Sequence, residues 1–324
     1  MLIEIKDLSV EFHGIRGKMK ALQHVSFSVN QGEIVGIVGE SGSGKSVTAL
    51  SILGLLEKNA AITSGEIIYA GRNLLALNKK DTQAIRGKEI GMVFQEPMTA
   101  LHPTMRVGKQ LAEVIKRHRG VTRKEAGRLA IQALQDVQIH DPELVARKYP
   151  FELSGGMRQR VVIALAMAAP PDLLIADEST TALDVTIQYE ILKLMKELSE
   201  KRGTAILLIT HDLGIVAQLC SRVVIMYAGE IIEAGNTSEV LRNPQHPYTQ
   251  ALLHALPDLV DPNEPLMAIS GEVPDLRNRP TGCSFASRCS QAVDLCRANK
   301  PKLEEQTPGH NVACWLAGGN GNHE

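Results

Sequence analysis

One stretch of the sequence has residues suited to binding phosphate groups: GESGSGKS, residues 39–46. It fits the pattern G-x-x-x-x-G-K-[ST], follows the apolar run EIVGIV and precedes a helical pattern, as this motif requires. Main-chain N–H groups of such a loop and the N-terminus of the next helix bind anions. Lys45 is expected to contact the outer phosphates during catalysis and Ser46 to bind Mg²⁺. The residues predicted to bind nucleotide here are Gly39, Glu40, Ser41, Gly42, Ser43, Gly44, Lys45, Ser46 and Val47.

A pair of acidic residues supplies the second part of this chemistry. The apolar segment LLIAD (173–177) predicts a buried strand, and Asp177 and Glu178 lie at its C-terminal end, where ligands bind in parallel sheets. Asp177 is expected to hold Mg²⁺, and Glu178 to orient or deprotonate the attacking water. The alternative is a strand that simply ends in two solvated acids, and the phosphate-binding motif in the same chain favours the catalytic interpretation.

The composition is that of a protein with a substantial buried core and no strong overall charge. The chain has 324 residues, 44% of them hydrophobic, which is enough for one large domain with an appendage or for two modest domains. Its 35 basic and 36 acidic residues provide no global field for nucleic acid, and no nucleic-acid partner is expected. The most apolar run, residues 161–176, is interrupted by Pro170 and Pro171, so we expect no membrane-spanning helix.

Runs of apolar residues predict the elements that position these groups. The first third is expected to form strands, and a helix is expected from Lys45. Residues 107–169 have a helical pattern, and apolar strands then alternate with helices, which indicates a parallel α/β sheet. The strands are predicted over 3–12, 21–29, 33–39, 173–177, 204–210 and, as one element, 222–235.

A change in composition predicts the domain organisation. Seven of the fifteen prolines lie between residues 257 and 308, where apolar periodicity is weak. We therefore expect one domain over 1–256, with a helical insertion at about 100–169, and a small Pro- and Cys-rich appendage over 257–324.

A third motif narrows the class of nucleotide-binding protein. LSGGMRQR (153–160), followed by a helix, resembles the signature of ABC-type ATPases. A serine and two glycines at a helix start offer a hydroxyl, free amides and a positive dipole end to a phosphate. A plain N-cap at Ser154 is the alternative, but other segments also match family motifs. They are the glutamine loop at Gln95, the segment Ala182-Leu183-Asp184 and the switch histidine His211.

The resemblance covers nearly the whole chain and implies both a fold and an assembly. The fold is α/β: an ABC-type ATPase domain with a mixed sheet core, an N-terminal antiparallel β region and a helical insertion, plus the small appendage. The assembly is a head-to-tail dimer in which one subunit's signature segment faces the partner's nucleotide. Family roles then fall on Ser154, Gly155, Gly156 and Gln159 toward the partner's ATP, His211 toward the γ-phosphate, Gln95 toward Mg²⁺ and Phe12 toward adenine.

One departure from the family and one competing role for Phe12 affect these assignments. The family commonly has proline after the catalytic glutamate, whereas this chain has Ser179, which leaves the rigidity of the following loop open. A phenylalanine at the end of an alternating strand is also a common core residue, so packing is the alternative for Phe12.

The segment HPYTQALLHALP (246–257) and the cysteine-bearing tail resemble the oligopeptide and dipeptide permease ATPases, which are also close to nickel-import ATPases. This implies a peripheral protein on the cytoplasmic face of the cell membrane that drives solute uptake. The implied partners are two transmembrane permease subunits, a second ATPase subunit, identical or related, and indirectly an extracytoplasmic solute-binding protein. A soluble ABC ATPase acting on nucleic acid is the competing class, but this chain has a single phosphate-binding motif and no long heptad stretch. The sequence does not identify the solute.

Four of the five cysteines gather near the end of the chain. Cys283, Cys289 and Cys296 are separated by five and six residues, and Cys314 follows, while Cys220 is expected to pack in the core. A zinc site, an iron–sulfur cluster and free buried thiols are all considered, although the spacing does not match the C-x₂₋₄-C hairpins of zinc modules. The resemblance to dipeptide-permease ATPases implies a [4Fe–4S] cluster held by these four thiolates.

Overall fold

The computed structural model describes residues 1–15, 17–178, 185–255 and 269–317. The chain divides into two compact units, each built from separate stretches of sequence. Unit 1 comprises Met1–Leu2, Val29–Ile34 and Ala76–Ile209, and unit 2 comprises Ile3–Ser28, Val35–Leu75 and Thr210–Glu324. The predicted domain boundary after residue 256 lies outside the described residues, so it stays a prediction.

The N-terminal part of unit 2 is an antiparallel sheet in the strand order β2-β1-β4-β5. Its first strand has a bulge at Asp7, where φ is +51° and the pairing register shifts between Lys6 and Ser9. The extra residue changes which alternate positions face the core, from Ile3 and Ile5 before the bulge to Leu8 and Val10 after it. The strands are β1 (Ile3–Gly14), β2 (Gly17–Val29), β4 (Ala60–Tyr69) and β5 (Arg72–Asn73).

A second sheet of unit 2 has the order β11-β12-β10-β9-β3. β3 pairs parallel with β9, and the other described pairs in this sheet are antiparallel, so the sheet is mixed. The prediction of a single strand over 222–235 is wrong: the chain turns at Ala228 and Gly229, with φ of +48° and +81°, and returns antiparallel. The strands are β3 (Ile34–Val38), β9 (Arg222–Tyr227), β10 (Glu230–Asn236), β11 (Glu304–Thr307) and β12 (His310–Val312).

Unit 1 contains the parallel strands β6, β7 and β8, paired in that order. Every residue of β7 and β8 is buried, as expected for strands covered on both faces. The predicted helix after residue 185 is present as α8, between β7 and β8 in the chain. The bounds are β6 (Ile90–Val93), β7 (Leu173–Asp177), α8 (Val185–Arg202) and β8 (Ala205–Thr210).

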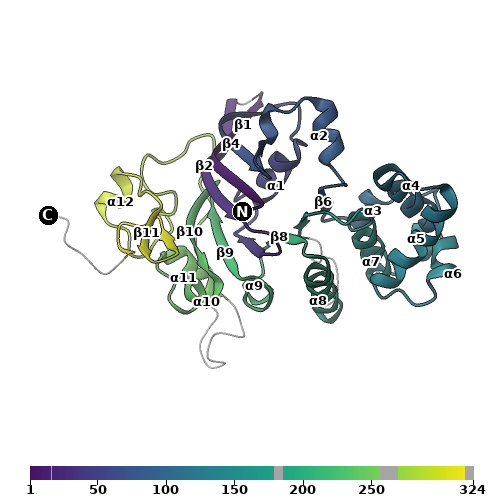
Figure 1. The fold of residues 1–324 in the computed structure, drawn as a ribbon. Coiled ribbons are helices and arrows are strands. Elements are labelled where there is room, and N and C mark those ends of the chain that lie inside the picture. The colour runs from purple at the N-terminus through teal and green to yellow at the C-terminus, as the bar shows by residue number, and fades with distance from the viewer. Residues whose placement is uncertain (16, 179–184, 256–268, 318–324) are drawn as a thin grey trace. The chain divides into compact units, whose positions relative to one another are not determined.

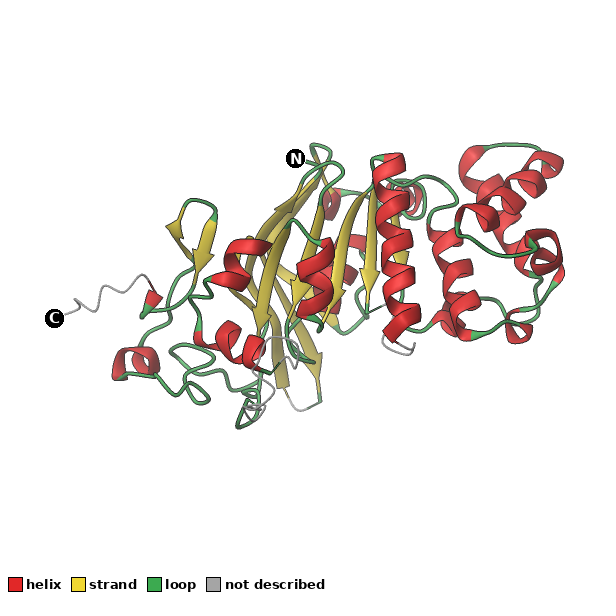
Figure 2. Ribbon diagram, turned by 90° about the horizontal axis from the view of Figure 1, so that it is seen from below, coloured by secondary structure: helices red, strands yellow, loops and turns green. Residues whose placement is uncertain are grey.

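The helices between β6 and β7 form a group with no strand among them, as Figures 1 and 2 show. Their core is made by residues spaced four apart, Val107, Leu111 and Ile115 on α4 against Ala126, Ala130 and Leu134 on α5. This part of the chain confirms the predicted helical pattern over 107–169. The helices are α3 (Pro97–Ala100), α4 (Val107–Arg119), α5 (Arg123–Asp136), α6 (Pro142–Arg147), η2 (Pro150–Glu152) and α7 (Gly155–Ala166).

The remaining helices connect these elements. The predicted helix start at Lys45 is confirmed by α1, and helix α11 contains most of the HPYTQALL segment. No helix in the described parts of the chain combines the length and apolar character needed to cross a bilayer. The bounds are α1 (Lys45–Leu53), η1 (Leu74–Ala76), α2 (Lys79–Ile85), α9 (Leu213–Leu219), α10 (Thr237–Arg242), α11 (Pro247–His254) and α12 (Asp294–Ala298).

Candidate functional site

The phosphate-binding loop of unit 2 runs from the buried strand β3 to the first turn of α1. Its glycines are required by both close packing and backbone conformation. A Cβ at Gly39 would lie 2.1 Å from the carbonyl oxygen of Met226, and one at Gly44, where φ is +101°, would lie 2.6 Å from Leu22. Only glycine therefore fits the loop at these two positions without displacing its neighbours.

The side chain of Lys45 lies inside this loop and contacts its backbone. Its Nζ donates to the carbonyl oxygens of Gly39 at 2.7 Å and Glu40 at 3.1 Å, and the residue is 5% exposed. Ser46, the predicted Mg²⁺ ligand, is exposed at the start of α1. A cation close to a helix N-terminus is the electrostatic arrangement that nucleotide phosphates require.

Glu40 has contacts that the sequence analysis did not predict. Its backbone N–H donates to the hydroxyl oxygen of Tyr248 at 2.9 Å, and Arg288 donates to both of its carboxylate oxygens, at 2.6 and 3.1 Å. This hydrogen bonding raises the pKa of Arg288 above its ordinary value. Tyr248 lies in the HPY segment and Arg288 between two tail cysteines, so their position near recognised motifs was the only sequence signal.

The acidic pair lies in unit 1 at the end of β7. Asp177 is 8% exposed, and Glu178 has φ of +41°, an uncommon value for a residue other than glycine. The backbone N–H of Glu178 donates to the carbonyl oxygen of Ile209 at 2.9 Å. The side-chain amide of Gln95 donates to the Glu178 carboxylate at 3.1 Å, so the structure brings these two predicted residues together.

The signature segment, also in unit 1, forms an exposed helix N-terminus. Ser154 is the N-cap of α7 and accepts a hydrogen bond from the backbone N–H of Met157 at 3.3 Å. Ser154 and Gly155 are exposed, whereas a Cβ at Gly156 would lie 3.1 Å from Ile187. Gln159 differs from them, because it is fully buried and its amide atoms have no hydrogen-bond partner in the described part of the chain. A role of Gln159 toward a partner's nucleotide stays a prediction.

The other predicted nucleotide residues lie on separate elements. His211 is exposed directly after β8, followed by Asp212, which caps α9 by accepting from the N–H of Ile215 at 3.2 Å. Phe12 is half-buried on β1, opposite Ala60. Ser179 and the segment Ala182-Leu183-Asp184 lie outside the described residues.

The four tail cysteines line one cavity of about 10 Å³ in unit 2, together with His246, Phe285 and Trp315 among others. That volume holds about one water molecule. Burial raises the pKa of the Cys283 thiol to about 11 and also raises those of Cys289 and Cys314. Within the described ranges, no three His, Cys, Asp or Glu side chains are arranged to hold a metal ion, so the predicted metal site gains no support here. Cys220 is buried, as expected for a packing residue, and burial raises its pKa to about 12.

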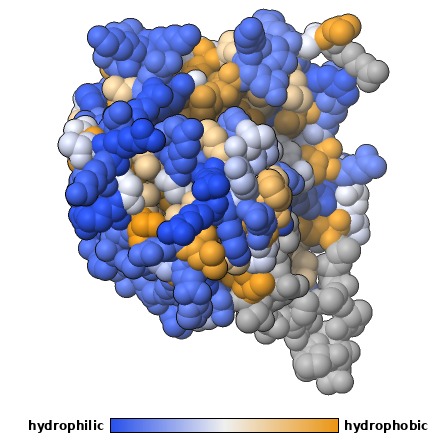
Figure 3. All heavy atoms as spheres, turned by 90° about the vertical axis from the view of Figure 1, so that its right-hand side faces the viewer, coloured by the Kyte–Doolittle hydropathy of each residue, from blue (hydrophilic) through white to orange (hydrophobic). Residues whose placement is uncertain are grey.

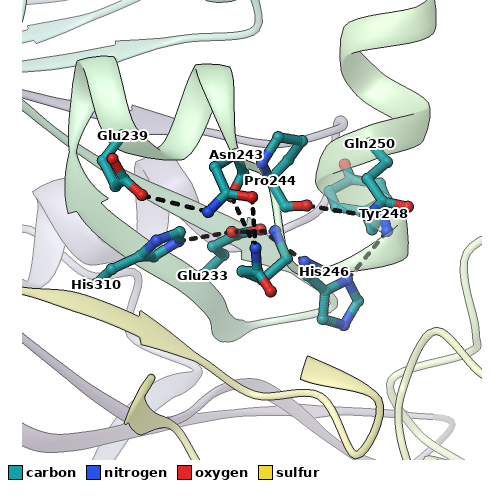
Figure 4. Close-up of polar contacts among 9 residues, drawn as sticks. Glu233, Glu239, Asn243, Pro244, His246, Tyr248, Gln250 and His310 are labelled. Atoms are coloured by element: carbon teal, nitrogen blue, oxygen red, sulfur yellow. Dashed lines mark hydrogen bonds and ion pairs between the residues drawn. The ribbon is translucent and has the colours of Figure 1, made fainter. Parts of the chain in front are cut away.

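A buried glutamate organises the start of α11, as Figure 4 shows. The carboxylate of Glu233 accepts from the backbone N–H groups of Gln245 at 2.7 Å and His246 at 3.0 Å, and lies 2.8 Å from His310 Nε2. The Nδ1 atom of His246 accepts from the N–H of Tyr248 at 3.0 Å, which caps the helix. Complete burial lowers the pKa of His246 to about 3, so this ring is neutral.

Comparisons with known proteins match both parts of the chain. The family model "ABC transporter" matches residues 22–181, and "Oligopeptide/dipeptide transporter, C-terminal region" matches residues 232–296. A probable peptide ABC transporter ATP-binding protein of Sinorhizobium fredii is 50% identical, covering 97% of this chain and 95% of its own. The dipeptide transport ATP-binding protein DppD of Lactococcus lactis is 48% identical, covering 97% and 90%.

Solved structures agree with these matches. A dimeric ATP-binding cassette bound to ADP and inorganic phosphate has a TM-score of 0.66 at 28% identity, covering 73% of this chain and 99% of its own. A cassette from Clostridium perfringens, part of an ABC transporter complex, has a TM-score of 0.64 at 28% identity, covering 75% and 91%. The predicted α/β cassette fold is confirmed.

Proposed function

Since this chain belongs to the ABC transporter family of ATP-binding proteins, we propose that it is the ATP-hydrolysing subunit of a membrane importer for dipeptides or oligopeptides. The observation that carries this proposal is the presence of two matched parts in one chain. One contains the phosphate-binding loop, residues 39–46, and the other is the oligopeptide/dipeptide transporter region, residues 232–296. The ATPase activity follows from the family, and the peptide substrate is the proposed part.

The residues of each unit have distinct tasks in ATP hydrolysis. The amides of the loop and Lys45 bind the phosphates, and Ser46, Asp177 and Gln95 provide oxygen ligands of the kind that Mg²⁺ prefers. When bound, Mg²⁺ neutralises charge on the phosphate oxygens. Glu178 accepts a proton from the water that attacks the γ-phosphorus, while the bond to the leaving phosphate oxygen breaks. Gln95 holds the carboxylate of Glu178 in place through its 3.1 Å hydrogen bond.

A second cassette completes the site in this proposal. The exposed N-terminus of α7, with Ser154 and Gly155, offers a hydroxyl and free amides to an anion outside its own protomer. These two residues serve the nucleotide on the partner's phosphate-binding loop, so hydrolysis requires a dimer. The partner is either a second copy of this chain or a related ATPase.

The permease subunits contact unit 1 in this proposal. Its segment 94–151 exposes four large apolar side chains: Phe94, Met98, Leu144 and Phe151 are 38%, 40%, 55% and 67% exposed, respectively. Figure 3 shows the face with helices α4, α5 and α6 as mainly hydrophilic, with separate apolar patches. Apolar patches with polar surroundings are typical of protein contact surfaces. The chain then works as a peripheral protein at the cytoplasmic face of the membrane, with a solute-binding protein on the other side.

The same proposal assigns the four tail cysteines to a [4Fe–4S] cluster. No three His, Cys, Asp or Glu side chains among the described residues are placed to hold a metal ion, so this assignment rests on the family resemblance and on the four thiols that share one cavity. The four tail cysteines would supply the one thiolate that each iron of such a cluster takes. The cavity that the four thiols share has room for about one water molecule, so it would have to widen to take the cluster, and binding would deprotonate the thiols.

An uptake assay tests the peptide assignment. Cells lacking this gene, complemented with the wild-type chain or with Lys45→Ala, are given radiolabelled dialanine, trialanine or nickel. We expect uptake of a peptide, but not of nickel, to return with the wild-type chain only. Recovery of nickel uptake without peptide uptake would contradict the assignment.

A further inference from the structure

Glu40, the second residue of the phosphate-binding loop, links the loop to the C-terminal part of unit 2. Its carbonyl oxygen accepts from Lys45 Nζ at 3.1 Å, inside the loop. Its N–H donates to Tyr248 at 2.9 Å and its carboxylate accepts twice from Arg288, both outside the loop. The Glu40 N–H shares a peptide group with the carbonyl of Gly39, which accepts from Lys45 Nζ at 2.7 Å. Displacement of Tyr248 therefore acts on a group that contacts the phosphate-binding lysine. Displacement of Arg288 acts on the same residue, Glu40, through its side chain.

Arg288 is held firmly enough to fix Glu40. Its side chain is 5% exposed. Besides the carboxylate of Glu40, the guanidinium donates to the hydroxyl of Tyr227 at 3.3 Å and to the carbonyl oxygens of Ile269 at 3.1 Å and Ser270 at 3.0 Å. A buried arginine whose donors are satisfied on several sides has one orientation, and its planar fork fits both oxygens of a carboxylate.

Tyr248 is fixed in a comparable way. It is fully buried, and its ring packs against Tyr227 and Phe285, with centroids 4.7 and 5.3 Å apart. His246, the N-cap of its helix α11, is anchored by Glu233 as Figure 4 shows. The hydroxyl therefore reaches Glu40 from a rigid element.

Both contacts depend on the cysteine-bearing segment. Phe285 and Arg288 lie between Cys283 and Cys289, in the stretch that lines the cysteine cavity. Phe285 supports the ring of Tyr248, and Arg288 binds Glu40 directly. The conformation of one short stretch thus determines how the loop is held at two points.

We propose that Arg288 and Tyr248 are positioning residues for ATP binding, which hold Glu40 and keep the phosphate-binding loop in the shape that receives phosphate. The inference rests on the proposed use of this loop for ATP. A loop without these contacts also populates conformations that do not bind phosphate. The apparent dissociation constant for ATP is then the intrinsic one divided by the fraction of molecules whose loop has the binding conformation. The C-terminal segment then controls ATP affinity without touching the nucleotide.

Equilibrium titration of the full-length protein with fluorescent mant-ATP tests this. We expect Arg288→Ala to weaken binding about tenfold, equivalent to about 1.4 kcal/mol, with kcat at saturating ATP within about twofold because the reacting groups are unchanged. Tyr248→Phe keeps the ring but removes the acceptor for the Glu40 N–H, and should weaken binding in the same direction. Arg288→Lys keeps the charge but loses the two-pronged contact, and should fall between wild type and Arg288→Ala.

Arg277→Ala is the matched control, because Arg277 also forms an ion pair with a carboxylate, Asp275 at 2.7 Å, but does not contact the loop. Circular dichroism melting identifies variants that do not fold. In a Glu40→Ala background, Arg288→Ala should cause little further loss, since both changes break one contact.

The outcomes separate this inference from the proposed function. A wild-type chain that does not bind mant-ATP, or a Lys45→Ala variant that binds it normally, would overturn both. If wild type binds and Lys45→Ala does not, but folded Arg288→Ala binds as tightly as Arg277→Ala, the positioning role alone is overturned. An equal loss from Arg288→Ala with and without Glu40 would also overturn it.

Discussion

The side-chain amide of Gln95 donates a hydrogen bond to the carboxylate of Glu178 at 3.1 Å, although the two residues are 83 positions apart. Glu178 has a left-handed backbone conformation with φ of +41°, and its N–H is bound to Ile209. Its carboxylate is therefore fixed by both its backbone and a neighbouring amide. An unusual backbone conformation retained at such a position is typical of functional sites.

Replacement of Glu178 should separate ATP binding from hydrolysis. Glu178→Gln keeps the size of the side chain but cannot take a proton, so we expect steady-state hydrolysis to fall by about 10²- to 10⁴-fold. The affinity for Mg-ATP should stay near that of wild type, because the phosphate-binding loop is unchanged. Phosphate release and mant-ATP titration measure the two properties.

Glu200→Gln is the control for this variant, since Glu200 is an exposed carboxylate on α8. It should hydrolyse ATP at the wild-type rate. Turnover of Glu178→Gln close to that of Glu200→Gln would contradict the assigned role of Glu178.

Changes at Ser154 should reveal the shared site. Ser154→Arg blocks an exposed helix N-terminus, so we expect loss of hydrolysis although the loop of the same chain still binds mant-ATP. If the chain forms homodimers, mixing Ser154→Arg with Lys45→Ala creates one intact composite site per mixed dimer. Hydrolysis by the mixture should then exceed that of either variant alone.

Inactivity of every mixture would exclude a functional homodimer. The remaining arrangement is then a dimer with a related ATPase, for which the same test uses co-expressed partner. Full hydrolysis by Ser154→Arg on its own would reject the head-to-tail arrangement.

Anaerobic purification tests the cysteine assignment. If four thiolates hold one cubane, the protein should be brown, absorb broadly near 400 nm and contain about four iron and four sulfide per chain. Cys289→Ser should lose the colour, whereas Cys220→Ser should keep it, since Cys220 is buried away from the four-cysteine cavity. Colourless protein with zinc, or without metal, would reject the cluster.

The buried His246 should make stability depend on pH. Its pKa is lowered from 6.5 to about 3 in the folded chain, so between these values the unfolded chain binds one more proton. The contribution of His246 to the free energy of unfolding therefore has its full value above about pH 6.5. It decreases by about 1.4 kcal/mol per pH unit as the pH is lowered toward 3. Urea unfolding from pH 4 to 7 measures this slope.

His246→Asn retains a helix-capping side chain and removes the titrating group, so its slope should be smaller than that of wild type by this amount. His254→Asn, at the exposed end of the same helix, is the control variant. Equal slopes for wild type and His246→Asn would show that His246 does not titrate as its burial requires.

The sequence by itself determined the features that depend on neighbouring residues. The loop 39–46 is defined by its own glycines, α1 begins where Lys45 follows them, and Ser154 caps the helix directly after it. Residues 173–177 form a buried strand because the first four of them are apolar. These features follow from local conformational preferences, which a contiguous motif specifies completely.

The hydrophobic pattern led to a wrong prediction where the chain reverses direction within an apolar run. Residues 222–235 have the composition of one strand, but Ala228 and Gly229 turn the chain between β9 and β10. A Cβ at Gly229 would lie 2.2 Å from the carbonyl oxygen of Ala21, so packing against a distant segment also requires glycine here. Hydrophobic periodicity carries no information about such a contact.

Only the tertiary structure decided which distant residues support the site. Arg288 is 248 positions from Glu40 and Tyr248 is 208 positions from it, yet both bind it directly. Cys296 lies on α12 and the other three tail cysteines lie in loops, yet all four reach one cavity. Such contacts depend on how strands and helices pack, and a side chain's partner across the fold is set by that packing rather than by its sequence neighbours.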